Sequence, residues 1–133
     1  MKDANTNLHI VDASYVLSFL LVDEGTKEVD DFFRSYVDGT IRLLSSEILP
    51  LEVLNALLAA HARKRISEKQ IKELSEKFWV LDIPLEKSDD ADCLAIALKY
   101  SLTAYDASYL VLAKRVGVIL HTHDKALKKV LSK

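Results

Sequence analysis

Two acidic residues directly follow short apolar segments of the sequence. Asp12 comes after Leu8–Val11, and Asp124 comes shortly after Val118–His121. Short apolar runs with β-branched residues are typical of strands buried in a parallel sheet. In such sheets ligands bind outside the carboxyl ends of the strands. The spacing therefore predicts that Asp12 and Asp124 project from the same edge of one sheet.

Two further acids are predicted to stand near that edge, each close to the start of a helix. Asp106 comes three residues after Thr103, and Glu52 lies in the helical segment Ile48–Ala60, which is otherwise almost entirely apolar. An unpaired buried charge is costly, so Glu52 needs a partner. It also begins a helical stripe of polar and small residues with Asn55, Ala56 and Ala59.

Four carboxylates around one cleft repel each other unless cations bind between them. Carboxylate oxygens are hard ligands that suit Mg²⁺ or Mn²⁺, and two such ions are the usual apparatus for hydrolysing phosphodiesters. The pattern thus predicts metal-dependent phosphoryl chemistry. A purely structural interpretation stays open, in which Asp12 and Asp124 are helix N-caps, with Thr122 as a competing cap, and Thr103 and Asp106 form a capping box.

Two other clusters of possible metal ligands give weaker support for a metal site. The segment His121-Thr-His-Asp124 suggests zinc, but it does not match the binuclear hydrolase pattern H-x-H-x-D-H. Alternate residues of a strand share one face, yet only one of the two histidines could then lie near Asp124. Acids in a first helical turn are favoured by the helix dipole, which gives Asp89, Asp90 and Asp92 a structural explanation.

A phospho-acceptor receiver domain would need paired acids after its first strand and an acid after its third. Asp12 is alone, and the third predicted strand ends at Ile83.

The order of apolar periodicity and capping signals predicts four strands separated by helices. Ser67–Gln70 reads as a capping box, and Pro50 is tolerated in a first helical turn. This alternation predicts a three-layer α/β/α sandwich on a mostly parallel, four- to five-stranded sheet. Expected strands are Leu8–Val11, Ile41–Leu44, Trp79–Ile83 and Val118–His121. Expected helices are 13–21, 26–36, 45 or 46 to 64, 68–78, 88–100, 104–115 and 124–131.

Length and composition place limits on the class of protein. The 133 residues predict one domain spanning residues 1–133, with residues 1–7 as a flexible N-terminal extension. No apolar run is long enough to span a bilayer, and no signal peptide is visible, so membrane insertion and export are not expected. The single cysteine, Cys93, fits a reducing, cytoplasmic compartment.

Four motifs resemble one protein family. They are Ile10–Ser14, Leu51–Leu57, Leu102–Tyr109 with Ala113, and Thr122–Asp124. Their order and types are similar to those of PIN-domain nucleases and, within these, of the VapC-type toxin ribonucleases. The resemblance covers about Leu8 to Leu131.

This resemblance implies that Asp12, Glu52, Asp106 and Asp124 bind one or two Mg²⁺ or Mn²⁺ ions and are catalytic. Supporting polar groups would be Ser14, Asn55 and Thr122. The implied reaction is metal-activated attack of water on RNA that leaves a 5′-phosphate. Toxin members are covered by an antitoxin segment and are usually homodimers. A housekeeping RNA-processing nuclease and a non-catalytic PIN-fold binding module stay open as alternatives.

Two basic stretches are predicted to border the acidic cleft and to hold the RNA backbone. A helix face that is simply exposed to solvent would also explain either stretch alone, so this alternative to RNA binding stays open. The residues concerned are Arg63, Lys64, Arg65, Lys125, Lys128 and Lys129.

Overall fold

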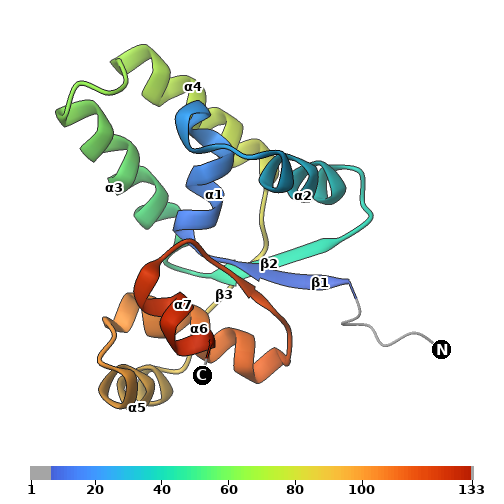
Figure 1. Ribbon diagram of the computed structural model, residues 1–133, viewed down its shortest axis with the longest axis vertical. Helices are drawn as coiled ribbons and strands as arrows, with labels where there is room; N and C mark the ends of the chain where they lie inside the picture. Colours follow the sequence, from blue (N-terminus) through green and yellow to red (C-terminus); the bar gives the residue numbers. More distant parts are fainter. Residues whose placement is uncertain (1–6, 133) are drawn as a thin grey trace.

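Four parallel strands form the sheet in a computed structural model of the chain, which describes residues 7–132 (Figure 1). Their spatial order is β3-β2-β1-β4, and every neighbouring pair is parallel. The carboxyl ends of the strands therefore meet at one edge, as the sequence predicted. The strands are β1 (Leu8–Val11), β2 (Arg42–Ser46), β3 (Leu85–Glu86) and β4 (Leu120–His121).

Helices cover both faces of the sheet. Helices α1 to α4 lie on one side and α5 to α7 on the other (Figure 1). This arrangement confirms the predicted α/β/α sandwich. The helices are α1 (Ala13–Leu20), the short 3₁₀ helix η1 (Val22–Glu24), α2 (Lys27–Val37), α3 (Leu49–Ala62), α4 (Glu68–Leu81), α5 (Asp90–Tyr100), α6 (Ala104–Val116) and α7 (Lys125–Leu131).

Helix α6 has the longest unbroken run of buried residues among the described helices. Its residues Ala107–Ala113 are all buried, because α6 contacts β1, β2 and β4 on one side and α5 on the other. A helix enclosed on both sides must be apolar nearly all round, which explains its weak amphipathicity. The first turn of α6, including Asp106, is consequently held against the sheet by the packing of the turns that follow.

The third strand was predicted at the wrong place. The segment Trp79–Ile83 was expected to be a strand, but α4 continues through Leu81, and β3 begins only after Pro84. Phe78 and Leu81 are buried while Trp79 and Val80 between them are exposed, which is the spacing of a helix and not of a strand. The helix ends where Asp82 adopts a left-handed conformation.

Two helix starts also differ from prediction. Ser45 and Ser46 belong to β2 and are buried, so α3 begins at Leu49 after Ile48. Ser88 was expected to cap the helix predicted at 88–100, but the cap of α5 is Asp89, because Ser88 turns inward and donates to the backbone oxygen of Ser108.

The predicted N-terminal extension, residues 1–7, lies outside the described residues except for Asn7. Asn7 donates a side-chain hydrogen bond to the backbone oxygen of Thr40. Within residues 7–132, no helix combines the length and apolar character needed to cross a membrane.

Three helices end on a residue with positive φ. Asp82 follows α4, Ser101 follows α5 and Gly117 follows α6, with φ of 47°, 55° and 77°. Glycine adopts this conformation without steric cost, whereas a side chain disfavours it. A Cβ built on Gly117 would meet no atom within 4 Å, so the cost of a side chain there is conformational.

We therefore expect opposite effects from two substitutions at equivalent helix ends. Gly117→Ala should lower the free energy of unfolding by about 1–2 kcal/mol. Ser101→Gly should leave it unchanged or raise it by up to about 1 kcal/mol, because glycine's entropy cost partly offsets the relief. Urea unfolding of both variants measures the difference. Equal destabilisation by both would show that these ends are not governed by backbone conformation.

Candidate active site

The four predicted acids come from helix starts at the carboxyl edge of the sheet. Asp12 links β1 to α1, and Asp124 links β4 to α7. Glu52 lies in the first turn of α3, which follows β2, and Asp106 lies in the first turn of α6. The parallel sheet thus brings together residues that are up to 112 positions apart in the chain.

Asp12 is buried, with a relative exposure of 3%. Its Oδ1 accepts the backbone N–H of Tyr15 at 3.0 Å and the Ser14 hydroxyl at 2.7 Å. Its Oδ2 accepts the Thr122 hydroxyl. The cap interpretation is therefore correct for Asp12, but the cap occupies only one of its carboxylate oxygens and is compatible with membership of a site.

Ser14 and Thr122 tie the end of β1 to the end of β4. Besides contacting Asp12, their hydroxyl oxygens lie 3.3 Å apart. Ser14 Oγ accepts the backbone N–H of His123 at 2.8 Å, and Thr122 Oγ1 accepts that of Asp124 at 2.9 Å. These two side chains were predicted to support the acids, and the structure places both in direct contact with Asp12.

Asp124 is the N-cap of α7, because its Oδ1 accepts the backbone N–H of Leu127 at 2.9 Å. Thr122, the competing cap, instead binds the N–H of Asp124 itself. Thr103 caps α6 by accepting the N–H of Asp106 at 3.0 Å, which leaves the carboxylate of Asp106 outside that cap bond.

Tyr109 is a site residue that the sequence analysis did not single out. Its hydroxyl donates to Glu52 Oε1 at 2.6 Å, although its side chain is only 1% exposed. A buried tyrosine usually finds a partner for its hydroxyl, so its place on the apolar face of α6 was the available signal. The bond joins α6 to α3 and supplies the partner that Glu52 was expected to need.

The acids interact as a group of like charges. Burial, together with the negative charges of Asp124, Glu52 and Asp12, raises the pKa of Asp106 to about 6. Burial is likewise the main cause that raises the pKa of Glu52 and of Asp12, and neighbouring acids add to it in both. Hydrogen bonds from Tyr109 to Glu52, and from Thr122, Ser14 and Tyr15 to Asp12, act in the opposite direction.

No lysine or arginine balances these charges within the described part of the chain. None of the ion pairs found there includes Asp12, Glu52, Asp106 or Asp124. Carboxylates held together without a cationic side chain are suited to bind a hard metal ion.

The described side chains do not, however, form a closed metal site. Across residues 7–132, no three or more His, Cys, Asp or Glu side chains are grouped closely enough to hold an ion together. Mg²⁺ commonly uses one or two carboxylates and keeps several waters, so the donor set still fits such an ion. The structure gives no support to a zinc site at His121, because its Nε2 lies 2.9 Å from Nδ1 of His9.

The remaining predicted residues lie at different distances from the acids. Asn55 is exposed, one turn beyond Glu52 on α3. Lys125, Lys128 and Lys129 are exposed on α7, whose first residue follows Asp124.

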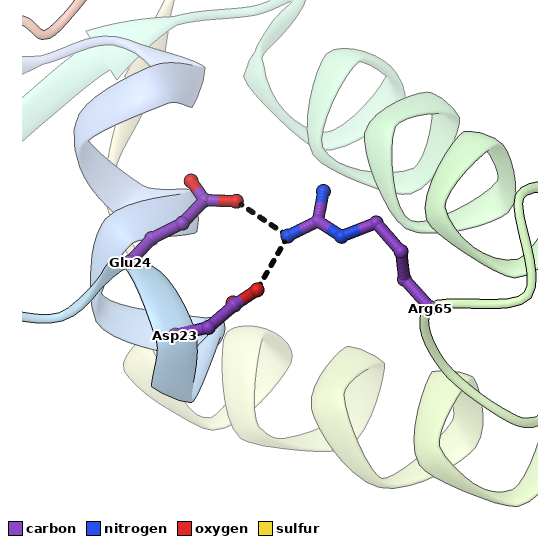
Figure 2. Close-up of polar contacts among 3 residues, drawn as sticks. All are labelled: Asp23, Glu24 and Arg65. Carbon is purple, nitrogen blue, oxygen red and sulfur yellow. Dashed lines mark hydrogen bonds and ion pairs between the residues drawn. The ribbon is translucent and has the colours of Figure 1, made fainter.

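The basic corner Arg63–Arg65 does not border the acids as predicted. It lies at the opposite end of α3 from Glu52, roughly 16 Å along the helix axis at 1.5 Å per residue. Figure 2 shows that Arg65 reaches η1 instead, where its Nη2 lies 2.8 Å from Asp23 and 3.2 Å from Glu24. The prediction was wrong because it overlooked the length of the predicted helix, which already separated Arg63 from Glu52 near the start of the helix.

Comparison with known proteins agrees with this arrangement. Residues 9–131 match the PIN domain family. The chain belongs to the PIN domain family. This confirms the family to which the four motifs pointed, and it removes the receiver-domain alternative.

Two similar proteins come from Pyrobaculum aerophilum. The PIN domain is 28% identical to Ribonuclease VapC3 over 122 residues, which are 89% of this chain and 90% of that protein. Its fold matches the crystal structure of PAE2754 with a TM-score of 0.72 and 24% identity, covering 94% of this chain and 85% of the other. The second comparison bears on the fold alone.

The burial of Asp106 and the repulsion among the acids predict that removing one charge stabilises the metal-free protein. Because the pKa of Asp106 is raised from 3.8 to about 6, the folded state binds more protons than the unfolded state between these values. Stability should therefore fall as pH rises through this range. In EDTA at pH 7.5, Asp106→Asn and Asp124→Asn should both have a higher Tm than the original protein, with a smaller gain at pH 4.

A matched control is Asp89→Asn at the cap of α5. Asn and Asp are nearly equivalent caps, so this substitution should not raise Tm. If the site variants gain nothing at pH 7.5, or gain equally at both pH values, like-charge repulsion does not operate at this edge.

Proposed function

We propose that this PIN domain is a metal-dependent ribonuclease that hydrolyses RNA phosphodiester bonds and acts as the toxin of a VapBC-type pair. The observation that carries the proposal is the group of four buried or half-buried acids with no cationic partner in the described residues. The similarity to Ribonuclease VapC3 supports the ribonuclease and VapC assignments.

In this proposal Asp12, Glu52, Asp106 and Asp124 hold one or two Mg²⁺ or Mn²⁺ ions. Such ions supply charge stabilisation at the phosphate and favour ionisation of the attacking water. A set of oxygen donors without histidine favours these hard cations. Ser14 and Thr122 keep Asp12 oriented, and Tyr109 keeps Glu52 directed toward the other acids.

Substrate and partners follow from the same site. Lys125, Lys128 and Lys129 are proposed to bind the RNA backbone from α7, while Arg65 is already paired. An antitoxin segment would cover the acids, and the chain would form a homodimer, as expected for this type of toxin. Asn55 is proposed as a further polar group near the reacting phosphate, and a cytoplasmic location stays a prediction.

The activity is tested with purified protein and RNAs that contain both paired and unpaired stretches. Cleavage should require Mg²⁺ or Mn²⁺, stop in EDTA, and leave fragments with a 5′-phosphate. Asp12→Asn should reduce the cleavage rate by at least about 100-fold, because it removes a charge on which the ions depend.

Asp89→Asn serves as the control, since Asp89 caps α5 and has no place among the four acids. It should cleave at the original rate. Cleavage that continues in EDTA and survives Asp12→Asn would overturn the proposal.

A further inference from the structure

A groove of about 480 Å³ adjoins the acids on the α7 side. Its volume lies within the range of small-molecule sites in proteins. It shares Thr122 with the acidic site, and that residue donates to Asp12. We call it the His123 groove, and its lining residues are Tyr15, Glu28, Leu120, His121, Thr122, His123, Lys128, Leu131 and Ser132.

Ring side chains form one wall of the His123 groove. The ring of His123 stacks on that of Tyr15, with centroids 5.0 Å apart and planes inclined by 26°. Tyr15 is only 5% exposed, and Phe32 packs edge-on against it at 5.1 Å. His123 itself is exposed. One face of its ring is therefore covered by a fixed support, while the residue remains accessible from solvent.

The backbone also fixes His123. Its N–H donates to Ser14 Oγ, and Ser14 in turn donates to Asp12. The backbone of His123 is thus held close to Asp12, the acid that follows β1, while Tyr15 supports the ring. Such a surface, flat, supported from behind and adjacent to the site of phosphodiester hydrolysis, suits an unpaired nucleobase.

The charges of the groove favour a base over a phosphate. Glu28 would repel a phosphate placed inside the groove, whereas a carboxylate can accept a hydrogen bond from an exocyclic amine of a base. Lys128 is exposed on the same lining and can meet the backbone phosphate of the bound nucleotide.

From this geometry we infer that the His123 groove binds one unpaired nucleotide of the RNA, next to the phosphodiester that is cut, with its base stacked on His123. The inference rests on the proposed ribonuclease function and adds a requirement for single-stranded RNA there. Proteins recognise unpaired RNA bases by stacking of this kind, including on histidine.

Binding of RNA without metal separates this inference from catalysis. Fluorescence anisotropy in EDTA would measure the affinity for short single-stranded RNAs, with 2-aminopurine placed at successive positions to detect stacking. His123→Ala should weaken binding about 5- to 150-fold, the range for losing one stacked base. His123→Phe should restore most of the affinity, because it keeps a flat ring. The backbone bond to Ser14 is retained in both variants.

His61→Ala is the matched control, since His61 is also exposed but lies near the far end of α3. It should bind RNA like the original protein, and duplex RNA should bind weakly and respond little to His123→Ala. Normal binding by His123→Ala, or equal loss in the Ala and Phe variants, would overturn the stacked-base assignment. RNA binding that depends on His123 without Mn²⁺-dependent cleavage would instead overturn the proposed ribonuclease and leave the groove as a binding site.

Discussion

Repulsion among four carboxylates at one edge of the sheet is the constraint on which the site depends. The fold keeps them together because packing elsewhere in the helices offsets the free-energy cost of holding like charges close to one another. Each acid stands at or near a helix start, and each helix is fixed by its apolar face. Asp106 shows this best, because it immediately precedes the buried turns of α6, and burial together with the neighbouring acids raises the pKa of its carboxyl group. The repulsion is then available to be relieved by a cation.

Hydrogen bonds hold the acids in place without neutralising them. The hydroxyls of Ser14 and Thr122 contact Asp12, and that of Tyr109 contacts Glu52. Hydroxyl donors orient a carboxylate and favour its charged form, whereas a lysine or arginine would compete with a metal ion. The same network reaches His123 through Ser14, so the acids and the His123 groove share one framework.

The sequence was sufficient to predict the layers, the parallel sheet and the placement of the four acids at or near helix starts, because capping residues and apolar periodicity are local signals. It failed at Trp79–Ile83, where an apolar run was read as a strand although its exposed and buried positions follow a helical period. It also misplaced Arg63–Arg65 and overlooked Tyr109. The contact of Tyr109 depends on which helix faces meet in space, and a single sequence does not determine that. The length of the predicted helix, in contrast, already placed Arg63 far from Glu52.

Binding of Mn²⁺ to the RNA-free protein would show whether the four carboxylates form a metal site. Calorimetric titration would compare the original protein with Asp12→Asn, Glu52→Gln, Asp106→Asn and Asp124→Asn, and with Asp89→Asn as the control. We expect saturable binding by the original protein and the control, and at least about tenfold weaker binding by each of the four site variants. Absence of binding to the original protein, or equal affinity in all variants, would contradict it.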